Sequence, residues 1–207
     1  MIELAVGKNK HILKERILKH ATMLFYANGV KMIKMDTIAK DLSISKKTLY
    51  LFFPTKEDLC LACLVKEKEA LCKHMELYKQ TGNHNVIEIL MENLLQEMKL
   101  FTNINPVFFE DIHKYKRIQN YLLDTEKEHY DEDYLAFQEG IREGLFRNDV
   151  DFAIIRTMFR ASIENAMQTP LHKEFGFVKI FHDIITTIIR GFSTTKGIEI
   201  IDRLLLQ

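Results

Sequence analysis

One short segment near the amino end constrains the fold of this chain more than any other. It runs from Ser43 to Leu59 and reads SISKKTLYLFFPTKEDL. At about 100° per residue, a helix over this segment has an apolar side and a polar side. The apolar side carries Leu49, Phe52 and Phe53. The other side carries Lys46, Lys47, Tyr50 and Leu51. Such a helix would expose a cationic, hydrogen-bonding face.

The residues before this helix predict a helix-turn-helix. Met35–Leu42 reads as a short helix, and only three residues separate it from the second one. Ala39 is small enough for two helices to cross closely, and Ile44 can fill the angle between them. Ser45 can accept a hydrogen bond from the backbone N–H of Lys47 or Thr48 and so cap the second helix.

A longer amphipathic helix precedes this unit and can close a three-helix core. Its apolar stripe is Leu13, Ile17, Leu18, Ala21, Leu24 and Phe25. The residues expected to meet this stripe are Ile38, Leu42, Leu49 and Phe53. Asn28-Gly29 is a typical helix end.

The charge is distributed unevenly along a chain whose formal net charge is zero. Residues 1–59 hold eleven Lys and Arg against six Asp and Glu, and the remainder holds 18 against 23. The amino-terminal part is therefore suited to nucleic acid, and the rest would repel it.

The remaining sequence predicts an all-α protein, because three prolines, eight glycines and few alternating β-branched runs argue against a sheet. We expect a helix-turn-helix domain over 1–54 and a helical effector-binding and dimerisation domain over 55–207. Expected helices in the second domain are Lys56–Gln80, Val86–Phe101, Pro106–Tyr115, a long helix or broken pair over Arg117–Gly144, Val150–Gln168, Glu174–Phe192, and a tail helix over Ile198–Leu206.

The amino-terminal motifs resemble the TetR family of bacterial transcriptional repressors. The matching stretches are Phe25-Tyr26-Ala27-Asn28-Gly29, Met35-Asp36-Thr37-Ile38-Ala39, Ser45-Lys46-Lys47-Thr48-Leu49-Tyr50 and Phe53-Pro54-Thr55-Lys56-Glu57-Asp58-Leu59. Further on, Gly140–Asp151 resembles the family's turn before its dimerisation helices. The resemblance implies a ligand-responsive homodimer that binds a palindromic double-stranded DNA operator and releases it when a small molecule enters the second domain.

The residues expected to contact DNA come from this unit and its borders. They are Lys34, Ser45, Lys46, Lys47, Thr48, Tyr50, Leu51 and Lys56. We expect Lys46, Lys47 and Thr48 to contact base edges or nearby phosphates, and Tyr50 and Lys56 to hold phosphates. Three positions depart from the family pattern: Lys34 replaces a frequent Thr or Ser cap, Ser43 replaces the turn glycine, and Phe52 replaces a phosphate-contacting Tyr or His.

The last two long helices are predicted to form the dimer interface, because the apolar arc of the second one spans about 180° rather than the usual 100°. The expected interface residues are Phe152, Ile155, Phe159, Ile163, Phe177, Phe181, Ile184 and Ile188. A deeply buried helix within one chain is the alternative.

Candidate effector-pocket residues are methionines and aromatics of the second domain together with three polar residues. They are Met75, Tyr78, Met91, Phe101, Phe108, Tyr115, Glu126, His129, Tyr130 and Asp133. Glu126 falls within an apolar stripe, so it must be paired, be neutral or meet a ligand. An internal salt bridge is the preferred explanation.

An enzyme is the rival function. Glu110/His113 and Glu126/His129 have the Glu-x-x-His spacing of di-iron bundles, and Cys60/Cys63 could serve a thiol oxidoreductase. The second ligand pairs and the catalytic sets that these activities need are not readable, so we expect no metal, no cofactor and no enzyme activity. We also expect a cytoplasmic protein, because no apolar run is long enough to span a membrane.

Overall fold

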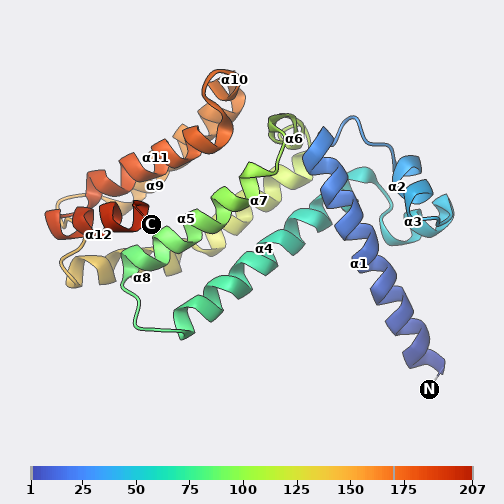
Figure 1. Cartoon of the computed structure of the whole chain (residues 1–207), viewed down its shortest axis with the longest axis horizontal. Helices are drawn as coiled ribbons and strands as arrows, with labels where there is room; N and C mark the ends of the chain where they lie inside the picture. Colours follow the sequence, from blue (N-terminus) through green and yellow to red (C-terminus); the bar gives the residue numbers. More distant parts are fainter. Residues whose placement is uncertain (1, 170, 207) are drawn as a thin grey trace. The chain divides into compact units, whose positions relative to one another are not determined.

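The computed structural model describes the backbone of residues 2–169 and 171–206, and the side chains of 9–166, 169, 171 and 174–206 (Figure 1). The helices are α1 (Ile2–Asn28), α2 (Met35–Asp41), α3 (Lys46–Phe52), α4 (Lys56–Gln80), α5 (Val86–Thr102), α6 (Pro106–Ile112), α7 (Lys116–Glu128), α8 (Tyr130–Arg142), α9 (Phe152–Gln168), α10 (Leu171–Phe175), α11 (Phe177–Phe192) and α12 (Thr195–Leu205). The all-α prediction is confirmed, and within the described residues an isolated bridge between Phe146 and Ser193 is the only β pairing.

Two expected features of the carboxyl-terminal helices took a definite form. The long segment after Arg117 is a broken pair, since α7 ends at Glu128 and α8 begins at Tyr130. The interval between α9 and α11 contains the short helix α10, while Pro170, expected to separate those two helices, lies outside the described residues. None of the described helices is long and apolar enough to cross a membrane.

The chain divides into two compact units. The first comprises residues 1–70 and 103–122, and the second comprises 71–102 and 123–207. The first unit thus adds α6 and the early parts of α4 and α7 to the helix-turn-helix. The boundary expected at 54/55 follows the helix-turn-helix alone and stays a prediction.

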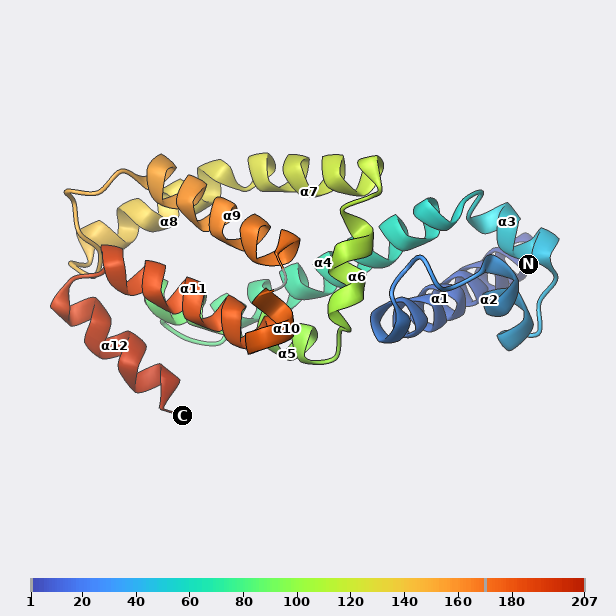
Figure 2. The ribbon, with the colours of Figure 1, turned by 90° about the horizontal axis from the view of Figure 1, so that it is seen from above.

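The first unit is built around the predicted three-helix core. The stripe of α1 is buried at Ile17, Leu18, Ala21 and Phe25, and it is met by Ile38, Leu49 and Phe53. Figure 2 shows α2 and α3 beside α1. On α6, Phe108 packs edge-on against Tyr26 with ring centroids 4.9 Å apart. The amino-terminal head therefore rests on α6 as well as on its own core.

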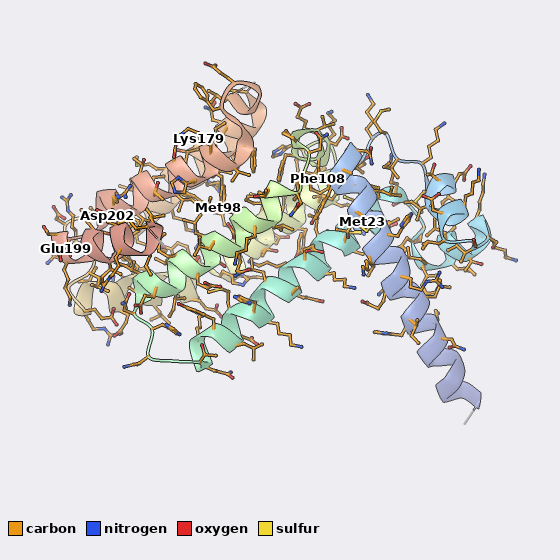
Figure 3. The ribbon with its side chains drawn as sticks, viewed as in Figure 1. Met23, Met98, Phe108, Lys179, Glu199 and Asp202 are labelled. Atoms are coloured by element: carbon orange, nitrogen blue, oxygen red, sulfur yellow. The ribbon has the colours of Figure 1, made fainter. Side chains whose placement is uncertain are left out.

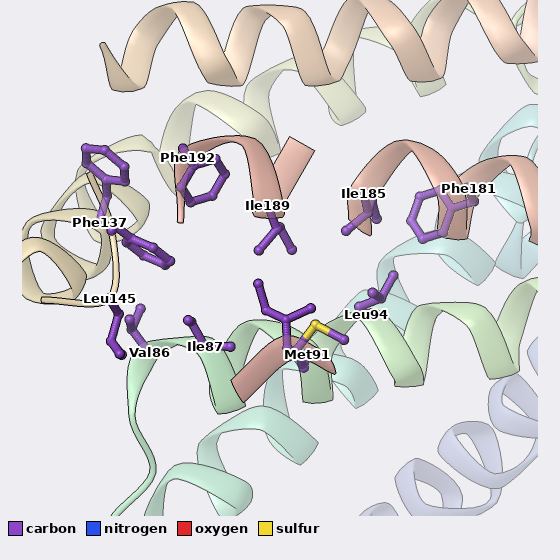
Figure 4. Close-up of a cluster of buried hydrophobic side chains, with 12 residues drawn as sticks. Val86, Ile87, Met91, Leu94, Phe137, Leu145, Phe181, Ile185, Ile189 and Phe192 are labelled. Atoms are coloured by element: carbon purple, nitrogen blue, oxygen red, sulfur yellow. The ribbon is translucent and has the colours of Figure 1, made fainter. Parts of the chain in front are cut away.

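The core of the second unit lies between α5 and α11. Figure 4 shows Val86, Ile87, Met91 and Leu94 facing Phe181, Ile185, Ile189 and Phe192. Charged side chains such as Lys179, Glu199 and Asp202 lie outside this core, as Figure 3 shows. Removing these apolar side chains from water is the main source of stability for the unit.

The Gly140–Asp151 segment joins α8 to α9 and depends on a close approach at its first residue. A Cβ on Gly140 would lie 2.1 Å from the ring of Phe146, so only glycine fits there. The segment is held by a hydrogen bond from the Arg147 N–H to the Phe192 carbonyl, 2.8 Å long. It therefore fixes the start of α9 against the end of α11.

Candidate nucleic-acid interface and effector site

The turn between α2 and α3 has the geometry that a helix-turn-helix requires. Ser43 takes a φ of 54°, in the left-handed region that glycine enters at the lowest cost, which explains why a glycine is usual there. The Ile44 N–H donates to the Ala39 carbonyl at 3.0 Å and tightens the turn. Ser45 then caps α3, because its Oγ accepts from the Thr48 N–H at 3.0 Å.

The outer face of α3 is exposed as the sequence predicts. Leu49 and Phe53 are buried, whereas Tyr50 is 45% exposed and Leu51 is 74% exposed. Lys47 is exposed and has no ion-pair partner among the described residues. The face thus offers one unpaired ammonium, a phenol and an apolar side chain to a partner.

The other polar residues of this face already have contacts within the protein. The Lys46 ammonium pairs with the Asp36 carboxylate, and both side chains remain more than half exposed. The Thr48 hydroxyl lies 2.8 Å from the Ser45 Oγ. An incoming phosphate would have to compete with Asp36 for Lys46, while Thr48 stabilises the cap.

The lysines that border the unit differ in their availability. Lys34 is exposed at the N-cap of α2 and makes no side-chain cap, as its replacement of Thr or Ser implies. The Lys56 ammonium instead donates to the carbonyls of Val30, Lys31 and Ile33 at 2.8, 3.1 and 3.0 Å. All three of its N–H groups thus brace the α1–α2 turn. A phosphate contact of Lys56 would require breaking one of these bonds, and it stays a prediction. Burial lowers the pKa of this ammonium.

Asp111 of α6 is a contributor to this site that sequence reasoning missed. Its side chain is almost fully buried, and its Oδ2 accepts from the Lys31 N–H at 2.7 Å. Gly29, at φ 78°, leaves room for this carboxylate, since an added Cβ would lie 2.9 Å from Oδ2. The only signal in the sequence is Gly29, which ends α1 in a conformation that exposes the next amides.

The predicted effector residues fall into separate groups. Met91 and Phe101 belong to the core of the second unit, and Met75 is buried there as well. Tyr78 stacks on His84 with centroids 4.0 Å apart. Phe108 and Tyr115 lie in the first unit.

Of the remaining predicted residues, Glu126 and Tyr130 line a cleft in the second unit. Its volume is about 340 Å³, and its lining residues are Leu123, Glu126, Lys127, Tyr130, Asp131, Arg156 and Arg160. Glu126 lies 3.6 Å from Arg156 and 3.8 Å from Arg160, which fits the internal salt bridge that we preferred for it. Asp133 accepts from Arg156 at 2.9 Å. His129 bonds the Thr125 carbonyl at 2.8 Å.

Arg156 and Arg160, the two cleft residues of α9, were not predicted from the sequence, and neither were Leu123, Lys127 and Asp131. The two arginines stand four residues apart on α9, so they share one face of that helix. The sequence did hold a signal for this pair, because two arginines at this spacing stand out on a helix whose other residues are largely apolar.

The predicted dimer residues mostly face the core of their own unit. Phe177 and Phe181 are buried, and Phe152, Ile155, Phe159, Ile163 and Ile188 pack against the same core. Only Ile184 is half-exposed without belonging to that cluster. The exposed apolar residues of α9 are instead Ile154 and Met158, 60% and 59% exposed. Most of the predicted interface residues therefore contribute to the core around α5, and their part in a dimer interface stays a prediction.

The cysteines and the Glu-x-x-His pairs show no catalytic geometry. Cys60 and Cys63 are buried, and burial raises the pKa of both thiols, that of Cys63 to about 11. A thiol with a raised pKa carries little of the reactive thiolate at neutral pH. Among the described residues, no three His, Cys, Asp or Glu side chains are grouped as metal ligands.

Comparison with known proteins yields matches at the level of sequence. Residues 17–63 match the sequence model of the bacterial regulatory proteins of the tetR family. An HTH-type transcriptional regulator of Staphylococcus aureus strain USA300 is 34% identical over 85 residues. That alignment covers 40% of this chain and 46% of the relative, so the chain spans about half the length of the curated relatives it matches.

Solved structures share the fold over most of the chain. A putative transcriptional regulator from Saccharomonospora viridis, in complex with choline, has a TM-score of 0.66 at 19% identity, covering 89% of this chain and 99% of that one. The transcriptional regulator FadR from Bacillus subtilis, in complex with stearoyl-CoA, has a TM-score of 0.66 at 18% identity, covering 86% and 98%. Residues 17–63 thus match the tetR family of bacterial regulatory proteins, and most of the chain shares the fold of these solved regulators.

Proposed function

We propose that this chain is a DNA-binding transcriptional regulator, acting as a homodimeric repressor that a small molecule releases from a palindromic operator. The observation that carries this proposal is the outer face of α3. Ser45 caps the helix, Leu49 anchors it from below, and Lys47, Tyr50 and Leu51 project outward. A short helix with this division of faces fits the major groove of B-DNA.

The contacts divide by chemistry. Lys47 and, after leaving Asp36, Lys46 meet base edges or phosphates, and the exposed Leu51 packs against a thymine methyl. Tyr50 and Lys34 hold phosphates and so fix the register of the head on the duplex. Lys56 acts indirectly by holding the turn that carries Lys31 and Lys34. The excess of basic residues over 1–59 supplies long-range attraction.

The dimer interface that we propose is the outer side of α9 and α11, which pack side by side in the second unit (Figure 2). It is centred on Ile154 and Met158 of α9, with the half-exposed Ile180 and Ile184 of α11. Two such faces related by a twofold axis would form a four-helix interface. The operator would then have half-sites about 34 to 36 Å apart, or a multiple of that distance.

The second unit is the place that we propose for the effector. Structures with the same fold were solved with choline or stearoyl-CoA bound, which supports a small-molecule ligand here without identifying it. An effector need supply only about 1 to 3 kcal/mol of coupling to weaken operator binding roughly 5- to 150-fold. DNA would weaken effector binding by the same factor. Operator binding and release would take place in the cytoplasm.

A binding experiment tests the DNA-binding proposal. Fragments of the source genome retained by the purified protein supply the operator, and fluorescence anisotropy measures its affinity at several salt concentrations. The logarithm of affinity should fall linearly with the logarithm of salt concentration, by about 0.9 per neutralised phosphate. Failure to retain any fragment, or a flat salt response, would contradict the proposal.

Substitution of Lys47 locates the interface. Lys47→Ala should weaken operator binding by about 1 to 3 kcal/mol, because the one unpaired ammonium on α3 is lost. Lys73→Ala is the matched control, since Lys73 is an exposed lysine of α4 in the second unit. Equal affinities for the two variants would exclude Lys47 from the contact.

A further inference from the structure

The junction of α7 and α8 is tied together by one arginine of α9. His129 separates the two helices, with φ −89° and ψ 0°. The Arg156 guanidinium donates to the carbonyl oxygen of Glu126 in the last turn of α7. It also donates to the Asp133 carboxylate in the first turn of α8 at 2.9 Å. Arg156 therefore holds both sides of the helix break.

Arg156 is committed to these partners. Its guanidinium carbon lies 5.2 Å from the centre of the Tyr130 ring, a cation–π contact, and its side chain is only 15% exposed. With a carbonyl, a carboxylate and a ring already in contact, this arginine forms part of the wall of the cleft. It is a poor candidate for the group that captures a ligand.

Arg160 lies one turn further along α9 and is far less committed. Its side chain is 44% exposed, and among the described side chains its ion-pair partner is Glu126 at 3.8 Å. That separation is too long for a good hydrogen bond. Within the described residues, most N–H groups of Arg160 are thus available in the lining of the cleft, where a planar guanidinium can hold a carboxylate by two parallel bonds.

The lining of the cleft favours an anion. Its basic residues are Lys127, Arg156 and Arg160, and its acidic residues are Glu126 and Asp131, which leaves one positive charge in excess. A ligand ammonium would have to compete with two arginines for Glu126. A ligand carboxylate would instead take the place of Glu126 beside Arg160.

The cleft also offers an apolar surface. Leu123 of α7 and the ring of Tyr130 of α8 both line it, and both are partly exposed. A volume of about 340 Å³ suits a small molecule rather than a long lipid. The ligand class that satisfies both the charge and the surface is a small carboxylate with an apolar body.

We propose that this cleft binds a small organic anion, whose carboxylate pairs with Arg160 in place of Glu126 and whose apolar part covers Leu123 and Tyr130. Glu126 also lies 3.6 Å from Arg156, so its displacement from Arg160 changes its ion pair with Arg156. Because Arg156 bonds both α7 and α8, ligand binding would alter the contacts that hold the two helices together. Its role as the effector site rests on the proposed regulatory function, whereas the binding itself does not.

Calorimetric titration of the full chain with sodium octanoate tests the site. Octanoate should bind at least tenfold more tightly than octylammonium of the same chain length. Hexanoate, two methylenes shorter, should bind roughly 15-fold more weakly than octanoate if the chain lies on the apolar wall. Equal binding of octanoate and octylammonium would overturn the assignment to an anion.

Three variants separate Arg160 from a general effect of charge. Arg160→Gln should weaken octanoate binding tenfold or more, and Glu126→Gln should strengthen it, because the competing carboxylate is gone. Arg203→Gln is the matched control, an exposed arginine of α12 in the same unit, and should bind octanoate like the unchanged protein. Thermal unfolding of each variant checks that the fold is kept. If Arg160→Gln folds and binds octanoate normally, the site is not here.

A second readout distinguishes the cleft from the regulatory proposal. Saturating octanoate should weaken operator binding between 5- and 150-fold in the unchanged protein and much less in Arg160→Gln. If octanoate binds through Arg160 and operator affinity does not change, the effector role of the cleft is refuted while its anion binding stands. If no DNA is bound at all, the proposed function fails and the calorimetric result still decides the cleft.

Discussion

The two units hold their cationic groups in different ways. In the first unit, Lys47 is exposed on α3 and has no ion-pair partner among the described residues. In the second, Arg156 contacts a carbonyl, a carboxylate and a ring at once, and Arg160 already faces the Glu126 carboxylate. An unpaired surface cation can meet a phosphate without giving up a contact, whereas an anion entering the cleft must replace a carboxylate. The first arrangement favours strong, general attraction to DNA, and the second favours selection among ligands.

Truncation of Leu49, the buried residue of α3, should give the largest effect. Leu49→Ala should lower the free energy of unfolding of the head by about 2 to 5 kcal/mol, because Leu49 is fully buried under α3. Leu51→Ala, on the exposed side of the same helix, should change it by less than about 0.5 kcal/mol. Denaturant unfolding of both variants measures the difference. Similar losses would show that the two faces of α3 are not divided as described.

A substitution on the outer side of α9 should have the next largest effect. Ile154→Glu places a carboxylate in the proposed twofold interface on both copies, and should weaken the dimer by about 2 kcal/mol or more, roughly 30-fold. Leu135→Glu, an exposed leucine of α8, is the control. Analytical ultracentrifugation over a range of concentrations measures the dissociation constant. A dimer unaffected by Ile154→Glu would move the interface to another surface.

The cap of α3 gives a smaller effect. Ser45→Ala removes the acceptor of the Thr48 N–H and should cost about 1 kcal/mol of stability. Ser45→Thr keeps a hydroxyl and should restore most of it. Operator affinity should follow the same order, since a frayed helix presents Lys47 less often. A Ser45→Ala protein with unchanged stability would show that the cap contributes nothing.

Acid provides the smallest of these effects. The Thr55 hydroxyl, followed by the Arg117 guanidinium, holds the pKa of Asp58 below its ordinary value. The stability from these contacts is therefore complete above about pH 3.9, the pKa of an unfolded aspartate, and is lost as pH falls through the lower folded value. The contribution is about 0.5 kcal/mol, as for exposed ion pairs. In Asp58→Asn the unfolding free energy of the first unit should therefore depend less on pH between about pH 4.5 and pH 2.5. The difference from the unchanged protein should be about 0.5 kcal/mol over that range.

Local rules predicted the head well because its short helices leave few choices. A serine before two lysines, a buried leucine at the fourth helical position and a short turn fix both the cap and the inward face. Tertiary contacts decided the rest. The apolar arc of α11 is wide enough for two surfaces, and its sequence alone does not tell whether Phe181 meets α5 or a second subunit. In the structure Phe181 meets α5.

Long-range contacts also explain why the partners of Lys56 and Arg156 could not be predicted. The partners of Lys56 are carbonyls 23 to 26 residues earlier in the chain, and carbonyls leave no trace in a residue pattern. Arg156 reaches Glu126 and Asp133 across 30 and 23 residues. Patterns within one helix predicted that Glu126 needs a partner, but could not name it.

The three carbonyls that surround Lys56 make lysine and arginine unequal at this position. A tetrahedral ammonium can aim three N–H groups at oxygens that converge on one point, and a flat guanidinium cannot. Lys56→Arg would keep the charge and still leave at least one of these oxygens without its donor. The loop that presents Lys31 and Lys34 would then lose its fixed shape, although no residue facing the duplex had been altered.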